Sequence, residues 1–333
     1  MRTLTYLGPR RMELQEAPEP EPAAGEVRVR VAAAAICGSD LHGFREASPR
    51  RIPPLVMGHE VAGTVDAAGP GADAGLVGAR VVVMPVVSCG RCDRCREGSP
   101  NLCPDRALMG ASFAGGFADA CVVPVGQVKH LPDALSDPVA SLVEPYANAV
   151  HVVDRAVRPG DSVLVIGAGC IGLFATRAAV LAGAARVFVS DTLPNRLALA
   201  ARLGGQPVLA EGAAEEVLAE TKGDGVDVVV DAVGLPATWA LGVKAARFGG
   251  RLEAIGLGAV EGPLDYHGVV TKGLTVSGSY ACVAEDFDRA ITLLSGGEPD
   301  VDGWITTMPL AQGADAFVAL VDGSNLTKVV LVP

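Results

Sequence analysis

Four cysteines lie within fifteen residues of one another, in a C-x2-C-x2-C-x7-C pattern. Thiolates at this spacing are typical ligands of one tetrahedral zinc ion, here Cys89, Cys92, Cys95 and Cys103. One short segment would supply all four ligands, so no position would remain for a substrate and the metal would only stabilise a loop. Disulfides are disfavoured in a chain of intracellular character. An iron–sulfur cluster stays open because Pro104 follows the last cysteine, although the last gap is longer than in the bacterial signature.

A second group of residues combines a thiol, imidazoles and carboxylates. It contains Cys37, Ser39, Asp40 and His42 in CGSDLH, His59 and Glu60 in GHE, and Glu144 in a stretch with few charges. Zinc accepts thiolate, imidazole and carboxylate ligands, and a buried carboxylate such as Glu144 would need a cation or hydrogen-bond partners. Taken singly, a histidine is more often structural and a cysteine more often a buried apolar residue. Spacing alone therefore leaves this second metal site undecided.

A glycine-rich turn follows the apolar stretch 162–166 and precedes the helical stretch 173–183. Strand, GAGCIG turn and helix, followed about 20 residues later by an acid at a strand end, form the full dinucleotide-binding fingerprint. The first glycine permits the turn, the second admits the pyrophosphate, and the third brings the helix close to the sheet. The residues expected to bind the cofactor are Gly167, Gly169, Cys170, Ile171, Gly172, Asp191 and Arg196.

The acid of this fingerprint, Asp191, indicates which dinucleotide binds. A carboxylate there accepts hydrogen bonds from the adenosine ribose and repels a 2′-phosphate, so NAD is favoured over NADP. Arg196 lies five residues further on, and a solvated helix charge is a simpler interpretation of it than a phosphate contact.

These residues need two kinds of structure to position them. Residues 26–144 contain short apolar or alternating stretches at 27–36, 60–69, 79–87 and 118–125, typical of strands in a β-rich domain. From residue 160 onward, strands and helices alternate, which predicts an α/β domain with a parallel sheet. The end of the chain contains a helical stretch at 286–297 and an apolar strand at 328–333 that could return to the first half.

Length and charge limit the possible functions. A chain of 333 residues is long enough for two domains. Its net charge of −11 argues against nucleic acid or an anionic membrane surface as a partner, and favours a small molecule. The most apolar stretch, 163–175, is shorter than the roughly 20 residues that span a bilayer. We therefore expect a cytoplasmic protein, and the remaining cysteines show no disulfide spacing.

Together, CGSDLH, GHEVAG, the cysteine lobe, Glu144-Pro145 and GAGCIG resemble the zinc-dependent medium-chain dehydrogenases/reductases over essentially the whole chain. The resemblance implies a GroES-like catalytic domain at 1–146 with the cysteine lobe at 89–103. A Rossmann domain at 147–276 follows, and residues 277–333 complete the catalytic domain.

The resemblance also implies roles for the second group of residues. Cys37 and His59 are then catalytic zinc ligands. Glu60 is favoured as the third ligand over Glu144, which would hold the zinc-bound water, and Asp40 would orient the histidine. Each chain would hold two zinc ions, one catalytic and one structural.

The implied reaction is NAD-dependent oxidation of an alcohol, with zinc as Lewis acid and a proton relay through Ser39, the nicotinamide ribose and His42. An exposed loop histidine is the alternative interpretation of His42. The motifs are most similar to the polyol, sugar-alcohol and threonine dehydrogenases. A polyol, sugar alcohol or cyclitol is the favoured substrate, and L-threonine or a simple secondary alcohol is the alternative.

A protein that binds zinc and NAD without catalysis is disfavoured, because the motif residues are all present. The chain lacks the long insertions of dimeric animal alcohol dehydrogenases, so a homotetramer is favoured over a dimer. The loop 43–57 carries Arg45, Arg50 and Arg51, which we interpret as solvated charges, although they could meet an anionic substrate group.

Overall fold

The computed structural model describes the whole chain, residues 1–333, and divides it into two compact units. The first unit contains Met1–Glu144, Val283–Gly297 and Val301–Pro333, and the second contains Pro145–Cys282 and Glu298–Asp300. The boundaries expected from the sequence differ from these by two residues (146 against 144) and six residues (276 against 282). None of the helices is both long enough and apolar enough to cross a membrane.

The first unit is rich in β-structure. Its strands are β1 (Arg2–Gly8), β2 (Arg11–Glu16), β3 (Glu26–Ala35), β4 (Leu55–Val56), β5 (Glu60–Ala68), β6 (Arg80–Val83), β7 (Val86–Val87), β8 (Ala107–Leu108), β9 (Ala120–Pro124), β10 (Val128–His130), β17 (Ile305–Pro309) and β18 (Lys328–Val332). Its α-helices are α1 (Gly38–Arg45), α2 (Asp93–Arg96), α3 (Asp137–Ala140), α10 (Ala284–Ser295) and α11 (Gly313–Val321). Four short 3-10 turns are η1 (Ala74–Leu76), η2 (Pro100–Leu102), η3 (Val125–Gln127) and η4 (Leu310–Gln312).

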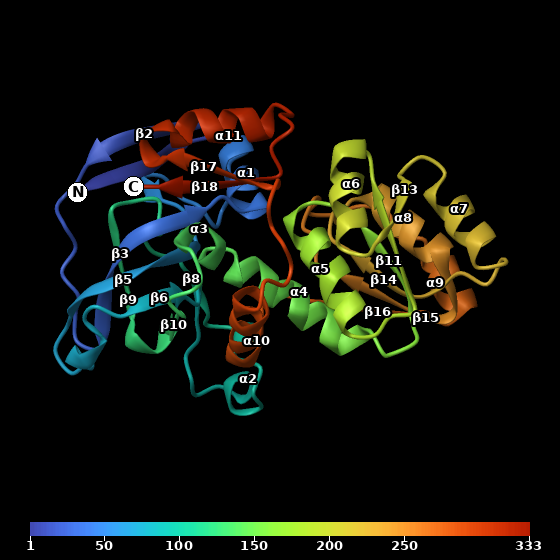
Figure 1. Ribbon diagram of the computed structural model, residues 1–333, viewed down its shortest axis with the longest axis horizontal. Helices are drawn as coiled ribbons and strands as arrows, with labels where there is room; N and C mark the ends of the chain where they lie inside the picture. The colour runs from blue at the N-terminus through green and yellow to red at the C-terminus, as the bar shows by residue number, and fades with distance from the viewer. The chain divides into compact units, whose positions relative to one another are not determined.

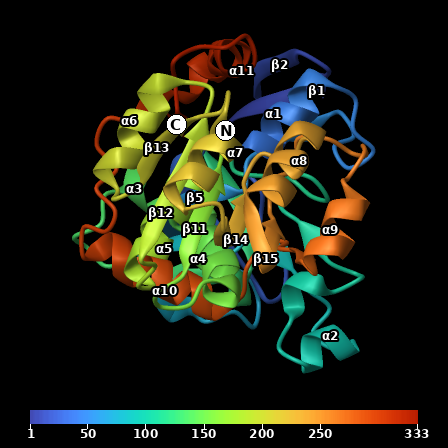
Figure 2. The same ribbon diagram turned by 90° about the vertical axis from the view of Figure 1, so that its right-hand side faces the viewer.

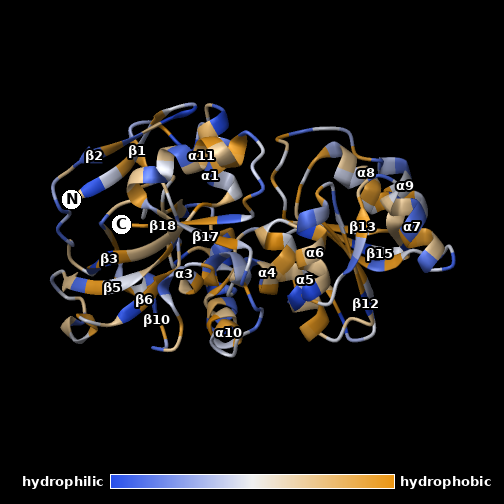
Figure 3. Cartoon of the chain, turned by 45° about the horizontal axis from the view of Figure 1, so that its top comes forward, coloured by the Kyte–Doolittle hydropathy of each residue, from blue (hydrophilic) through white to orange (hydrophobic).

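The main sheet of this unit has seven strands in the order β10-β6-β5-β3-β18-β17, with β9 also paired to β3. In β3 every second side chain faces the core, as expected for a strand. Val27, Val29 and Val31 are buried, while the residues between them are only half-buried. In Figure 3, orange apolar segments alternate with white and blue ones along these strands. The core also contains Phe117 and Phe317.

The last strand of the chain lies beside one of the first. β18 pairs antiparallel with β3, with Val330 opposite Ala35, and Figure 1 shows the red C-terminal strands next to the blue N-terminal ones. The other neighbour of β3 is β5, and there Glu60 lies opposite the same Ala35. Three strands far apart in sequence therefore meet at the end of β3.

The second unit is a doubly wound α/β domain. Its strands are β11 (Ser162–Ile166), β12 (Arg186–Asp191), β13 (Gln206–Leu209), β14 (Val226–Asp231), β15 (Ala246–Ala254) and β16 (Thr275–Gly278). Its helices are α5 (Cys170–Leu181), α6 (Pro194–Arg202), α7 (Ala213–Glu220), α8 (Pro236–Ala245) and α9 (Tyr266–Lys272), and α4 (Val143–Ala156) spans the boundary between the units.

The six strands are parallel in the order β13-β12-β11-β14-β15-β16, which is the Rossmann order 3-2-1-4-5-6. Figure 2 shows the strands side by side with helices flanking the sheet. One core packs Leu164 and Val229 of the sheet against Val217 of α7 and Val243 of α8. The fold class expected from the sequence, a β-rich domain with a Rossmann domain, is confirmed.

Candidate active site

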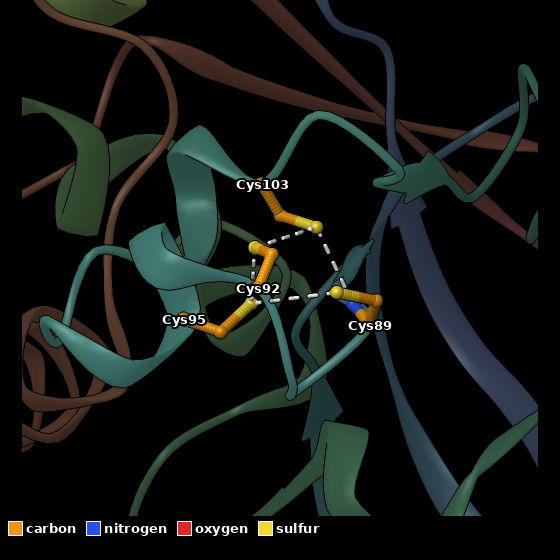
Figure 4. Close-up of side chains that lie close together, drawn as sticks. All are labelled: Cys89, Cys92, Cys95 and Cys103. Atoms are coloured by element: carbon orange, nitrogen blue, oxygen red, sulfur yellow. Dashed lines mark hydrogen bonds between the residues drawn. The ribbon is translucent and has the colours of Figure 1, made fainter.

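The cysteine lobe gathers four thiols around one point (Figure 4). The sulfur atoms of Cys92 and Cys95 are 3.5 Å apart, those of Cys92 and Cys103 are 3.8 Å apart, and those of Cys89 and Cys95 are 4.0 Å apart. A tetrahedral zinc ion with Zn–S bonds of about 2.3 Å would separate its sulfur ligands by about 3.8 Å. The four thiols therefore fit one metal ion, and none forms a disulfide.

The local backbone prepares this lobe for a metal. The backbone N–H groups of Arg91 and Cys92 are directed at Cys89 and lower the pKa of its thiol to about 6. A thiolate is the form that binds a metal, so the lowered pKa of Cys89 favours metal binding. Cys103 is fully buried, whereas the other three cysteines are half-buried.

The second group of candidate metal ligands is built by the sheet of the first unit. Cys37 follows β3 and caps α1, His59 directly precedes β5, and Glu60 begins β5. Because β3 and β5 pair antiparallel, the end of one lies beside the start of the other. One ligand atom from each of the three residues lies within 4.8 Å of the others. Thiolate, imidazole and carboxylate form a three-ligand set that leaves a fourth zinc position for substrate.

Asp40 of α1 connects the two halves of this group. Its Oδ1 lies 3.4 Å from Nδ1 of His59, and its Oδ2 accepts a hydrogen bond of 3.2 Å from the backbone N–H of Cys37. Burial acts to raise the pKa of Asp40, but His59 and Arg51 lower it below its usual value. For His59, burial acts to lower the pKa, and the charges of Asp40 and Cys37 raise it well above its usual value. The site thus favours positive charge at its centre.

Lys328 is a member of this site that the sequence analysis missed. It begins β18, is buried, and forms an ion pair with Glu60 while donating a 2.9 Å hydrogen bond to the carbonyl of Ile36. Glu60 itself is fully buried. No spacing rule connects residues 60 and 328. The sequence indicated only that the apolar strand at 328–333 could return to the first half of the chain.

The other predicted catalytic residues occupy different positions. Ser39 lies on α1, and His42 is exposed on the same helix, where partial burial and the charge of Arg45 lower its pKa. Glu144 is buried in the first turn of α4 and lies outside the three-ligand group. Its contact with a zinc-bound water stays a prediction.

The interpretation of all three loop arginines as solvated charges is wrong for Arg51. Arg45 and Arg50 are exposed, but Arg51 is only 6% exposed and donates to Ser39 and Asp40. The acceptors that make burial of a guanidinium possible lie eleven and twelve residues away, on a helix whose orientation the sequence does not reveal.

The glycine turn is tightly packed at two of its glycines and open at the third. Gly167 has φ +93°, and a Cβ at Gly172 would lie 1.6 Å from the carbonyl oxygen of Gly167, so both positions require glycine. A Cβ at Gly169, the N-cap of α5, would meet nothing within 4 Å, which leaves room at the helix N-terminus for a phosphate.

Asp191 is buried at the end of β12, and its two oxygens accept hydrogen bonds from the backbone N–H groups of Ala168 (2.7 Å) and Leu193 (2.9 Å). Its carboxylate is therefore fixed beside the turn. Cys170 and Ile171 begin α5, and Arg196 is half-buried on α6.

Comparisons with known proteins cover both units. The model for the alcohol dehydrogenase GroES-like domain matches residues 23–133, and the model for zinc-binding dehydrogenases matches residues 170–296. L-threonine 3-dehydrogenase from Pyrococcus abyssi is 36% identical, covering 88% of this chain and 87% of that protein. Sorbitol dehydrogenase from Bacillus subtilis is 32% identical, and the match covers 97% of this chain and 95% of that protein.

Solved structures agree over the full length. An alcohol dehydrogenase from Escherichia coli in complex with NADH superposes with a TM-score of 0.92 at 33% identity, covering 100% of this chain and 99% of that chain. The 2R,3R-butanediol dehydrogenase from Bacillus subtilis superposes with a TM-score of 0.90 at 26% identity, and the match covers 100% of this chain and 99% of that chain.

Proposed function

This chain belongs to the zinc-dependent medium-chain dehydrogenase/reductase family, and we propose that it oxidises a secondary alcohol of a polyol, sugar alcohol or cyclitol to the ketone with NAD. The observation that carries the proposal is the buried group of Cys37, His59 and Glu60. When bound there, zinc would supply a Lewis acid for the substrate hydroxyl.

The chain's own residues would orient the substrate and remove its proton. Ser39 lies two residues after Cys37. Its hydroxyl would accept the substrate proton while giving up its own, and His42 on the same helix would pass a proton on to water. The turn at 167–172 would bind the pyrophosphate of NAD, whose nicotinamide supplies the hydride acceptor.

A carboxylate among the ligands favours substrates with neighbouring hydroxyl groups. Carboxylate oxygens accept hydrogen bonds from a second hydroxyl, whereas a second thiolate would accept them poorly. A mono-alcohol would leave these polar groups unpaired. Relatives named for sorbitol and butanediol fit this substrate class. L-threonine is the second candidate, because the L-threonine 3-dehydrogenase is 36% identical to this chain, compared with 32% for the sorbitol dehydrogenase.

Steady-state NADH formation with matched substrates tests the proposal. We expect a higher kcat/KM for 2,3-butanediol than for 2-butanol, and a higher value still for at least one polyol or cyclitol. Faster oxidation of 2-butanol than of every diol and polyol would overturn the substrate class. Faster oxidation of L-threonine than of all of them would establish the second candidate.

We propose NAD rather than NADP as the cofactor because the buried Asp191 carboxylate is held at the glycine turn. Wild type should show a higher kcat/KM with NAD, and Asp191→Ala should narrow the difference. Asp191→Asn keeps a hydrogen-bonding side chain and removes the charge, so it isolates the contribution of the charge to the preference for NAD over NADP. Equal use of both cofactors by wild type would contradict the proposal.

We also propose that each chain binds two zinc ions and that the protein is a cytoplasmic homotetramer. The thiols fit a reducing compartment because all eight cysteines are free. β16 is an edge strand, and exposed apolar side chains lie close to it in the sequence, at Leu257, Val260, Tyr266, Val270 and Val276. Light scattering of the purified protein would test the tetramer, and a monomeric mass would exclude it.

A further inference from the structure

Arg51 is a charged side chain buried beside the catalytic group. Its exposure is 6%, whereas its neighbour Arg50 is exposed. Buried arginines need acceptors, and the Nη2 atom of Arg51 finds two of them on α1: Oδ1 of Asp40 and Oγ of Ser39, each at 3.1 Å. The loop that carries Arg51 therefore contacts two residues that flank the metal ligands.

Helix α1 is shaped to receive this side chain. A Cβ at Gly43 would lie 2.4 Å from Cδ of Arg51, so any larger residue at this helical position would displace the arginine stem. The backbone N–H of Arg51 also donates to the carbonyl of Ser48, which holds the loop turn in place. Arg51 is thus held at its backbone by Ser48 and at its guanidinium by Ser39 and Asp40.

The two acceptors of Arg51, Asp40 and Ser39, have different roles in the site. Asp40 contacts His59 through Oδ1 and the backbone of Cys37 through Oδ2, so its position controls the orientation of two metal ligands. Ser39 is the first proton acceptor of the proposed reaction. Because its Oγ accepts a hydrogen bond from Arg51, the hydroxyl proton must point away from the arginine and one lone pair remains for the substrate hydroxyl.

We propose that Arg51 is a positioning residue that fixes Asp40 and Ser39 in one geometry, coupling the affinity of the catalytic metal to the orientation of the proton acceptor. The Ser39 half of this inference rests on the proposed function. The Asp40 half concerns metal affinity and holds whatever the substrate is.

The experiment compares holoenzyme variants at Arg51 with Arg50→Met, a matched control one residue away. Arg51→Met should weaken zinc binding at the Cys37 site by about 10- to 100-fold and lower kcat by a similar factor, the range typical for residues that orient metal ligands. KM should change far less. Zinc transfer to a chromogenic chelator measures affinity, with the zinc of the cysteine lobe as internal reference. Arg50→Met should match wild type in both measurements.

Arg51→Lys separates the effect on zinc affinity, through Asp40, from the effect on proton transfer, through Ser39. A lysine keeps the charge opposite Asp40 but lacks the planar guanidinium, so zinc affinity should recover while kcat stays low. In the double variant with Ser39→Ala, adding Arg51→Lys should lower kcat no further than Ser39→Ala alone does. Additive losses would overturn the Ser39 half. Wild-type zinc affinity in Arg51→Met would overturn the Asp40 half.

Two further outcomes are covered by the same design. If Arg51→Met does not fold, Gly43→Ala displaces the arginine without removing it and should weaken zinc binding in the same direction; unchanged binding there would overturn the inference. If wild type oxidises none of the alcohols, the proposed function fails, but zinc transfer from the Arg51 variants still decides the role of Arg51 toward the metal.

Discussion

The two groups of candidate metal ligands are built in opposite ways. The lobe takes its ligands from one short segment, Cys89 to Cys103, and three of its four cysteines are half-buried. The catalytic group takes Cys37 from the turn after β3 and Glu60 from the start of its partner β5, and its histidine and glutamate are buried. The ion pairs beside the catalytic group are buried, with Arg51 on Asp40 and Lys328 on Glu60. Those of the lobe, Arg94 with Glu97 and Arg96 with Asp93, are exposed.

This difference indicates what each metal does for the protein. The lobe has little apolar core of its own, so metal binding and folding of the segment should be one event. The catalytic group is positioned by sheet pairing, and its buried anions already have cationic partners without a metal. Metal loss should therefore unfold the lobe but only inactivate the catalytic group.

The largest effect is expected at the lobe, in Cys95→Ser. The apparent binding free energy of structural zinc sites is on the order of 10 kcal/mol, and loss of this ion should lower the melting temperature and expose residues 89–103 to proteases. Differential scanning calorimetry and limited proteolysis measure both. Cys282→Ser, outside either group, serves as control. A lobe that resists proteolysis after losing its metal would show that it folds without zinc.

A large effect on activity, with little effect on folding, is expected in His59→Ala. Loss of the Lewis acid should reduce turnover at least about a thousandfold, because such an ion supplies several kcal/mol of transition-state stabilisation. The exposed His130, changed to alanine, is the control. Circular dichroism should show a native spectrum in both variants. An unfolded His59→Ala protein would mean that the catalytic metal is also structural.

A smaller effect is expected in Lys328→Met, which leaves the Glu60 carboxylate buried without its cation. Removing one partner of a buried ion pair should cost about 3 kcal/mol in unfolding free energy of the metal-free protein, and saturating zinc should restore part of it. Lys129→Met breaks a more exposed pair with Asp288 and should cost less than about 1 kcal/mol. Equal losses in the two variants, measured by urea unfolding, would contradict the ion-pair account.

The sequence predicted local features more fully than distant ones. The cysteine lobe and the turn at 167–172 each lie within one segment, where spacing determines geometry, and the structure brings their residues together. Lys328 and Glu60 meet only because β18 and β5 both pair with β3, and nothing in the local sequence indicates that register. Arg51 was misinterpreted because its burial depends on the face of α1 that packs against the loop.

Zinc content per chain is the measurement that tests the separation of the two metal groups most directly. If each group binds its own ion independently, as we propose, elemental analysis should find two zinc ions in wild type, one in Cys95→Ser, one in His59→Ala and none in the double variant. Loss of both ions from either single variant, or iron in place of zinc in wild type, would contradict this account.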